Sequence, residues 1–178
     1  SIVEISRQCG PNFKLSINLT AKSLLWDVDK YIDETLKKYN VPASQLWIEI
    51  TEQDVLAKST MVLEKLNNLK AQGHVMMIDD FGMGHTSILY LQSSNFGVVK
   101  LDGSLVKDIL TNTTNQQIVS SIVTLADRLH IKIIAEFVET VEQRDKLLEL
   151  GCKWYQGYLY EKPVQLAEFI DFMEEHSL

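Results

Sequence analysis

Two adjacent acids, Asp79 and Asp80, follow the apolar run Val75-Met76-Met77-Ile78 and precede Phe81-Gly82-Met83-Gly84. A short apolar run bounded by turn residues is typical of a buried strand. Buried carboxylates require a cation or hydrogen-bond donors nearby. Successive strand side chains point to opposite faces, so both acids reach one site only where the backbone bends, which the glycines permit. On this stretch alone, a loop that merely begins with two acids is an equally good interpretation.

Polar residues also stand at the ends of the other strands that the sequence predicts. They are Asn18, Glu49, Lys100 with Asp102, Glu136 with Glu139, and Gln156. Each has an ordinary explanation when taken alone, such as a pairing of Glu49 with a helix lysine or a turn role for Gln156. Their coincidence on six strand ends favours one shared site.

These residue types fit metal-assisted phosphoryl transfer. Asn18, Glu49 and Asp79 supply the oxygen ligands that Mg²⁺ or Mn²⁺ prefers. Asp80 and Glu136 could hold a second ion nearby, as two-metal sites require. Lys100 could orient a water or neutralise developing charge, and Glu136 could take a proton from that water.

Strands and helices alternate along the chain. Strands are expected at 13–20, 46–51, 75–79, 98–101, 131–135 and 153–158. Helices are expected at about 26–40, 59–73, 87–92, 118–129, 140–151 and 166–173, with the tail of another at 1–13. The helix at 140–151 should begin with a capping box formed by Thr140 and Gln143.

Such βαβ units imply parallel strands, in either a (β/α) barrel or a doubly wound sheet. A doubly wound sheet gathers its ligands near one switch point, whereas every strand of a barrel ends at the same mouth. A polar residue at each strand end therefore favours a TIM-type (β/α) barrel.

Composition narrows the class of protein. The 178 residues are expected to form one domain, and the net charge of −7 argues against bulk nucleic-acid binding. A small phosphate ligand still fits if metal ions lie between it and the acids. Cys9 and Cys152 have no pairing pattern, which suggests a reducing compartment. No apolar run suits a membrane span, so we expect a cytoplasmic segment without membrane contact.

Six motifs occur in order, and together they carry a family resemblance. They are Ser-Ile-Asn-Leu-Thr (16–20), Ile-Glu-Ile-Thr-Glu (48–52), Ile-Asp-Asp-Phe-Gly (78–82), Val-Lys-Leu-Asp-Gly-Ser-Leu-Val (99–106), Ala-Glu-Phe-Val-Glu-Thr (135–140) and Tyr-Gln-Gly-Tyr (155–158). In this order they resemble the EAL domain, a family of bacterial cyclic di-GMP phosphodiesterases built on a modified (β/α)8 barrel. The resemblance runs from about residue 14 to the C-terminus.

The resemblance implies hydrolysis of cyclic di-GMP to linear pGpG with Mg²⁺ or Mn²⁺, expected as two ions. The implied metal ligands are Asn18, Glu49, Asp79, Asp80 and Glu136. The residues that would act on the water or the substrate, or support the site, are Lys100, Asp102, Glu136, Glu139 and Gln156. Glu52 would anchor the loop after Asp80. A homodimer and a fusion to upstream sensory or GGDEF domains are further expectations.

Departures from the family leave an alternative open. The Glu-Ala-Leu signature is absent from residues 1–178, so about six of eight strands are expected here, in a single domain that lacks its N-terminal strands. A piece of a longer protein and a natural truncation both fit.

Met83-Gly84-His85-Thr86 replaces the usual Thr-Gly-Tyr-Ser, which makes loop regulation uncertain. Phe137 replaces a glycine and would either crowd the mouth or pack outward on the next helix. The alternative function is an inactive EAL-like domain that binds cyclic di-GMP or transmits a signal.

A protein kinase is a weaker interpretation. Asp80-Phe81-Gly82 spells the magnesium motif of that class, but neither a glycine-rich nucleotide loop nor a His-Arg-Asp motif accompanies it.

Overall fold

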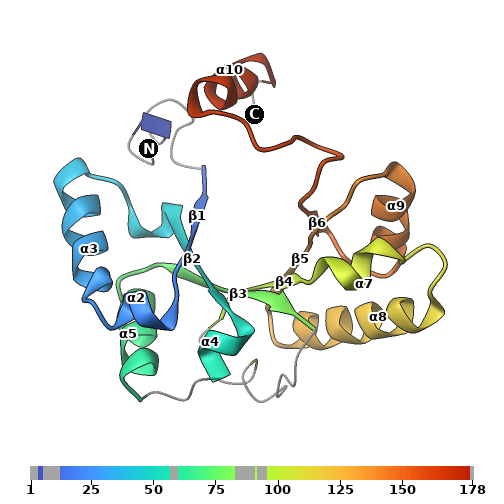
Figure 1. Cartoon of the computed structure of the whole chain (residues 1–178), viewed down its shortest axis with the longest axis horizontal. Coiled ribbons are helices and arrows are strands. Elements are labelled where there is room, and N and C mark those ends of the chain that lie inside the picture. The colour runs from blue at the N-terminus through green and yellow to red at the C-terminus, as the bar shows by residue number, and fades with distance from the viewer. Residues whose placement is uncertain (1–3, 6–12, 57–59, 83–90, 92–95, 177–178) are drawn as a thin grey trace.

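Six parallel strands form one sheet in the computed structural model, which describes residues 4–5, 13–56, 60–82, 91 and 96–176. Each strand pairs with the next one in the sequence, so the order β1-β2-β3-β4-β5-β6 never reverses. The strands are β1 (Leu15–Asn18), β2 (Leu46–Thr51), β3 (Val75–Phe81), β4 (Val98–Leu101), β5 (Lys132–Ala135) and β6 (Trp154–Tyr155). A doubly wound sheet would reverse at a switch point. The sheet instead curls with helices outside it, which confirms the incomplete barrel (Figure 1).

Helices connect the strands. They are α2 (Ala21–Leu24), α3 (Val28–Tyr39), α4 (Glu52–Leu56), α5 (Thr60–Ala71), α7 (Gly103–Lys107), α8 (Thr113–Arg128), α9 (Val141–Glu149) and α10 (Leu166–His176), with a 3-10 turn at Ala43–Gln45. The sequence did not predict α2, α4 or α7, because four or five residues are too few to show a helical period. The helix expected at 87–92 and the tail at 1–13 lie largely outside the described residues.

Three strands differ from expectation by two residues or more at one or both ends. β1 spans Leu15–Asn18 rather than 13–20. β3 continues through Phe81 rather than stopping at Asp79. β6 comprises two residues rather than six, because the Gln156 carbonyl accepts a hydrogen bond from the Val138 N–H and the chain then turns at Gly157. The strands expected at 46–51 and 98–101 are confirmed.

The hydrophobic core lies between the outer face of the sheet and the helices. Ile48, Val99 and Leu101 are fully buried on that face, against helix residues such as Leu66 and Leu147. Side chains alternate along a strand, so the neighbours of these core residues point into the barrel. Burial of an aliphatic side chain contributes roughly 1.5–3 kcal/mol, and it fixes the direction of each intervening polar residue.

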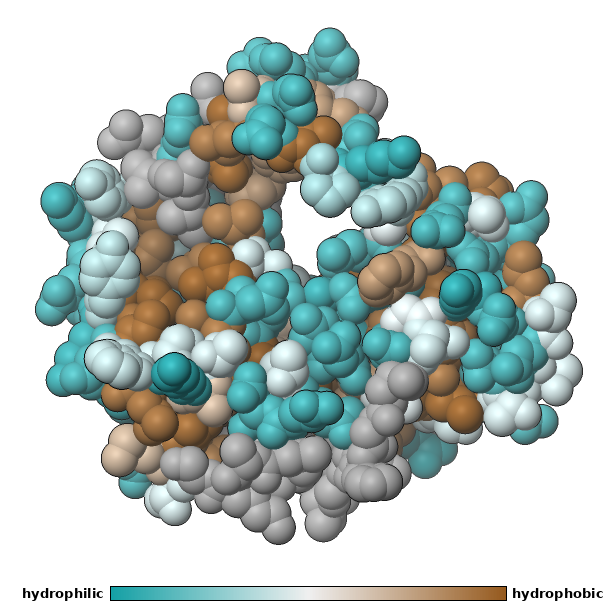
Figure 2. Space-filling model, in the orientation of Figure 1, coloured by the Kyte–Doolittle hydropathy of each residue, from teal (hydrophilic) through white to brown (hydrophobic). Residues whose placement is uncertain are grey.

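The molecule is open between its first strand and its C-terminal segment. Figure 2 shows this opening, and a cavity of about 670 Å³ lies there, lined by residues that include Phe13, Leu15, Gln156 and Phe169. Across the part of the chain that the structure describes, no helix combines the length and the apolar character needed to cross a membrane.

Candidate active site

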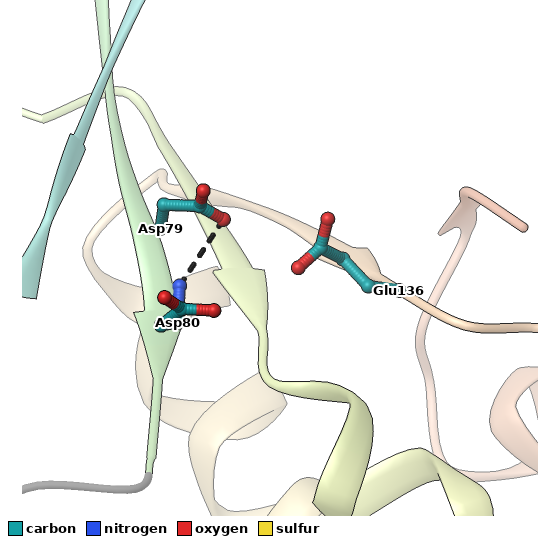
Figure 3. Close-up of side chains that lie close together, drawn as sticks. All are labelled: Asp79, Asp80 and Glu136. Carbon is teal, nitrogen blue, oxygen red and sulfur yellow. Dashed lines mark hydrogen bonds between the residues drawn. The ribbon is translucent and has the colours of Figure 1, made fainter. Parts of the chain in front are cut away.

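The two adjacent acids are brought together by a break in the regular strand. The register between β3 and β4 shifts between Ile78 and Phe81, and Asp80 adopts a left-handed φ of 56°. The Asp80 N–H donates to Asp79 Oδ1 at 3.1 Å. The predicted bend is therefore confirmed, but it lies at Asp80 itself as well as at Gly82, whose φ is 108°. Both carboxylates can consequently reach the same site (Figure 3).

Lys100 on β4 lies among three carboxylates from other parts of the sheet. Its Nζ is 2.9 Å from Glu49 Oε2, 3.2 Å from Asp79 Oδ1 and 2.7 Å from Glu136 Oε1. Burial alone would lower the pKa of Lys100, but its hydrogen bonds to Glu136 and Glu49 outweigh burial and raise that pKa above 10.5. The ammonium group therefore stays charged and holds β2, β3 and the segment after β5 in one electrostatic network.

Asp79, Asp80 and Glu136 form a compact acidic cluster, which we call the acid trio. One oxygen of each lies within 4.8 Å of the others, although they come from β3 and from the residue after β5 (Figure 3). Burial raises the pKa of Glu136 in spite of Lys100. Burial also raises the pKa of Asp80, and the charges of Asp79 and Asp102 add to that effect.

The acid trio fits a divalent metal ion by the chemistry of its donors. Three carboxylates that converge in a partly buried place repel one another, and a hard cation would relieve that repulsion. Oxygen donors of this kind suit Mg²⁺, Mn²⁺ or Ca²⁺. The trio contains three of the five residues proposed as ligands from the sequence.

The other two proposed ligands, Asn18 and Glu49, lie side by side but outside the acid trio. Asn18 at the end of β1 is in register with Glu49 on β2, and its side chain is exposed. Glu49 is 5% exposed and bonds to Lys100. The two residues thus extend the row of oxygen donors across the neighbouring strands.

Asp102 and Glu139 line a pocket of about 400 Å³ beside the acid trio, which we call the side pocket. The side pocket is lined by Asp102, Gly103, Ser104, Lys107, Phe137, Glu139 and Gln143. Asp102 also caps α7, because its Oδ1 accepts the Ser104 N–H at 2.8 Å. Gln156 is exposed and lines the larger opening instead.

Glu52, the expected loop anchor, is the first residue of α4. It is 5% exposed, and neither carboxylate oxygen has a hydrogen-bond partner among the described residues. A buried carboxylate without a partner is costly, so this position calls for a donor. Residues 83–90, the loop that Glu52 would anchor, lie outside the described residues, and the anchoring role stays a prediction.

Sequence reasoning missed four side-pocket residues: Gly103, Ser104, Lys107 and Gln143. An aspartate directly after a strand is a typical N-cap, so Asp102-Gly103-Ser104 could have predicted α7 and its neighbours. The ring contact of Phe137 is with α7, which precedes it in the chain, and not with the expected next helix, α9. The ring packs against Gly103 at the start of α7, and it also lines the side pocket beside the acids.

Comparisons with known proteins agree with this geometry. The sequence model of the EAL domain matches residues 1–163. A relative from Escherichia coli (strain K12), the cyclic di-GMP phosphodiesterase PdeF, is 35% identical over 167 residues, which are 92% of this chain and 22% of PdeF. The chain spans about a fifth of the length of the first curated relatives it matches.

Solved structures show the same fold. The PaMucR phosphodiesterase in complex with c-di-GMP superposes with a TM-score of 0.85 at 30% identity, over 94% of this chain and 71% of that one. Klebsiella pneumoniae BlrP1, in a manganese/cy-diGMP complex at pH 9.0, gives a TM-score of 0.85 at 30% identity, over 91% of this chain and 42% of that one.

Proposed function

The chain belongs to the EAL domain family, and on this premise we propose that it is most of a metal-dependent phosphodiesterase domain that hydrolyses cyclic di-GMP to linear pGpG in the bacterial cytoplasm. One observation carries the proposal. Lys100 and the acid trio converge from three separate strand ends into one site of hard oxygens and a single cation. Relatives with the same fold are named for this substrate.

The proposed cofactors are two Mg²⁺ or Mn²⁺ ions. Asp79, Asp80 and Glu136 would hold them, with Glu49 and Asn18 completing the set of oxygen donors. Such ions, when bound, would withdraw charge from the phosphodiester and make water a better nucleophile.

The chain's own residues would supply positioning and charge. The Lys100 ammonium is fixed by three carboxylates, so it can stabilise negative charge that develops on the phosphate without reorganisation. Glu136, whose Oε1 lies 2.7 Å from Lys100 Nζ, would accept a proton from the attacking water. Asp102 and Glu139 line the adjoining side pocket, where they would contact the substrate or support the site, and Gln156 would act from the other side of the mouth.

A binding module without catalysis is the second candidate. The observation that favours it is the departure of Met83-Gly84-His85-Thr86 from the family's usual Thr-Gly-Tyr-Ser in the loop after the two acids. Such a module would bind cyclic di-GMP and transmit a signal without cleaving it.

Mn²⁺-dependent formation of pGpG from cyclic di-GMP, followed by chromatography, tests the proposal. The assay would use this chain and a version extended by the upstream segment that carries the signature. Replacement of Asp79 by Asn should lower kcat by a factor of about 100 or more, because it removes a carboxylate from the metal cluster. The matched control is Asp33→Asn on α3, because Asp33 pairs with the exposed Lys37.

Three results would count against the proposal in different ways. Binding of cyclic di-GMP without turnover in the extended version would favour the binding module. Unchanged turnover in Asp79→Asn would place the metal site elsewhere. If the extended version neither bound nor cleaved cyclic di-GMP, both candidates would be excluded.

A further inference from the structure

The side pocket is lined by residues that adjoin the acid trio in the chain or act on it through their charge. Burial and the charge of Asp79 raise the pKa of Asp80, and the charge of Asp102, which lines the side pocket, adds to that effect. Phe137 directly follows Glu136 in the chain and lines the same side pocket. A ligand whose phosphate met Glu136 would therefore have the side pocket of about 400 Å³ next to it, at Phe137.

Phe137 holds an unusual backbone conformation in this place. Its φ is 55°, a left-handed value that bulky residues rarely adopt, and its residue surface is 61% exposed. Neither local propensity nor burial of the ring accounts for a phenylalanine here. Backbone strain of this kind is concentrated at functional sites, where the surrounding structure enforces it.

Two neighbours fix the aromatic ring. A Cβ atom built on Gly103 would lie 2.3 Å from Phe137 Cδ2 and 2.7 Å from its Cγ, so the ring rests on the bare backbone at the start of α7. Val138, the next residue, is fully buried, and its N–H donates to the Gln156 carbonyl at 3.1 Å. The ring is thereby held at the edge of the side pocket with much of its surface exposed.

We propose that Phe137 is a stacking platform for one purine base of cyclic di-GMP and that the side pocket is the subsite for this base. Aromatic side chains bind bases through their faces, since every base offers a π surface. The exposed carboxylate of Glu139 in the same pocket suits the N1–H and N2–H donors of guanine. This inference rests on the proposed function, because it takes its ligand from there.

Equilibrium binding of cyclic di-GMP and cyclic di-AMP in Ca²⁺, measured by calorimetry on the full chain, tests the platform. Phe137→Gly and Phe137→Leu should each weaken cyclic di-GMP binding roughly 5- to 100-fold, because both lose the aromatic face. Phe137→Tyr, the matched control, should stay within about 2-fold. Phe137→Gly should unfold at the same or a higher temperature than the unaltered chain, because glycine relieves the positive φ.

A double-mutant cycle separates stacking from a general disturbance. Gly103→Ala should displace the ring and weaken binding when Phe137 is present, but should have no effect in the Phe137→Gly background. Binding within about 2-fold of the unaltered chain in both Phe137→Gly and Phe137→Leu would overturn the platform and leave the proposed function standing. Failure of the unaltered and the extended chains to bind cyclic di-GMP would overturn both.

Discussion

At the scale of single residues, the site is dominated by one buried cation among several anions. Lys100 is 5% exposed and contacts Glu49, Asp79 and Glu136 within 3.2 Å. Removal of one partner from a buried ionic network is expensive, because the remaining charges keep their desolvation cost without compensation. Lys100 is therefore as important for the fold of the metal-free chain as for its chemistry.

We expect Lys100→Met to lower the free energy of unfolding by about 3–5 kcal/mol at pH 8 in the absence of metal. The loss should be smaller at pH 5. Without the lysine, the pKa of Glu136 in the folded chain rises further above its unfolded value. The cost of ionising Glu136 in the folded chain is therefore absent at low pH and grows as pH rises from the unfolded pKa to the folded one. Urea denaturation at both pH values measures the effect, and Lys37→Met on α3, an exposed lysine, is the control.

The charge of Lys100 itself adds no pH dependence near neutrality. Its folded-state pKa is raised, so its contribution is fully present below 10.5 and declines only at higher pH. A loss of unfolding free energy below about 1 kcal/mol in Lys100→Met would contradict a stabilising ionic network around Lys100. The same loss at pH 5 and pH 8 would contradict it too.

At the scale of elements, helix α9 holds one wall of the side pocket in place. The Thr140 hydroxyl accepts the Gln143 N–H at 3.2 Å, and Gln143 Oε1 accepts the N–H groups of Glu139 and Thr140. Gln143 Nε2 also donates to the Lys107 carbonyl at 3.4 Å, which links α9 to α7. The capping box that the sequence predicted thus also orients the segment that carries Glu139.

Thr140→Ala should destabilise the chain by about 1 kcal/mol, because it removes the side-chain acceptor at the helix start. Thr140→Ser keeps the hydroxyl and should lose less than half of that amount. Thermal unfolding followed by circular dichroism measures both variants. Equal stability of the alanine and serine variants would mean that the cap contributes little.

At the scale of the whole molecule, metal binding should stabilise the open barrel. The acid trio comes from β3 and from the residue after β5, so an ion bound to it would link separate parts of the sheet. Binding only to the folded state stabilises it by about 2.7 kcal/mol at an ion concentration 100 times Kd. For a chain of this size that corresponds to a rise in Tm of about 5–10 °C.

Titration with Mn²⁺ during thermal unfolding checks this expectation. The rise in Tm should be lost in Asp79→Asn, whose fold should remain intact without metal. It should also shrink as pH falls, because protons compete with the ion for Asp80 and Glu136, whose pKa values are raised. An equal rise in Asp79→Asn and the unaltered chain would show that Mn²⁺ binds elsewhere.

The sequence by itself determined the elements and their order. Apolar periodicity located the six strands and the main helices, because side-chain direction follows directly from spacing along a strand or helix. Motif order identified the family, and the polar residues at the strand ends predicted that Glu49 and Lys100 share one site, where their side chains lie 2.9 Å apart. These features depend on residues that are close together in the chain, so the sequence predicts them without knowledge of the tertiary structure.

Only the tertiary structure decided how the site is assembled. The left-handed turn at Asp80, the contact of Lys100 with three carboxylates and the packing of Phe137 on Gly103 all join residues from different strands and loops. Their geometry depends on how far the sheet curls and where its register shifts, which no local pattern specifies. The raised pKa values of Asp80 and Glu136 arise for the same reason, since burial and nearby like charges both depend on the folded chain.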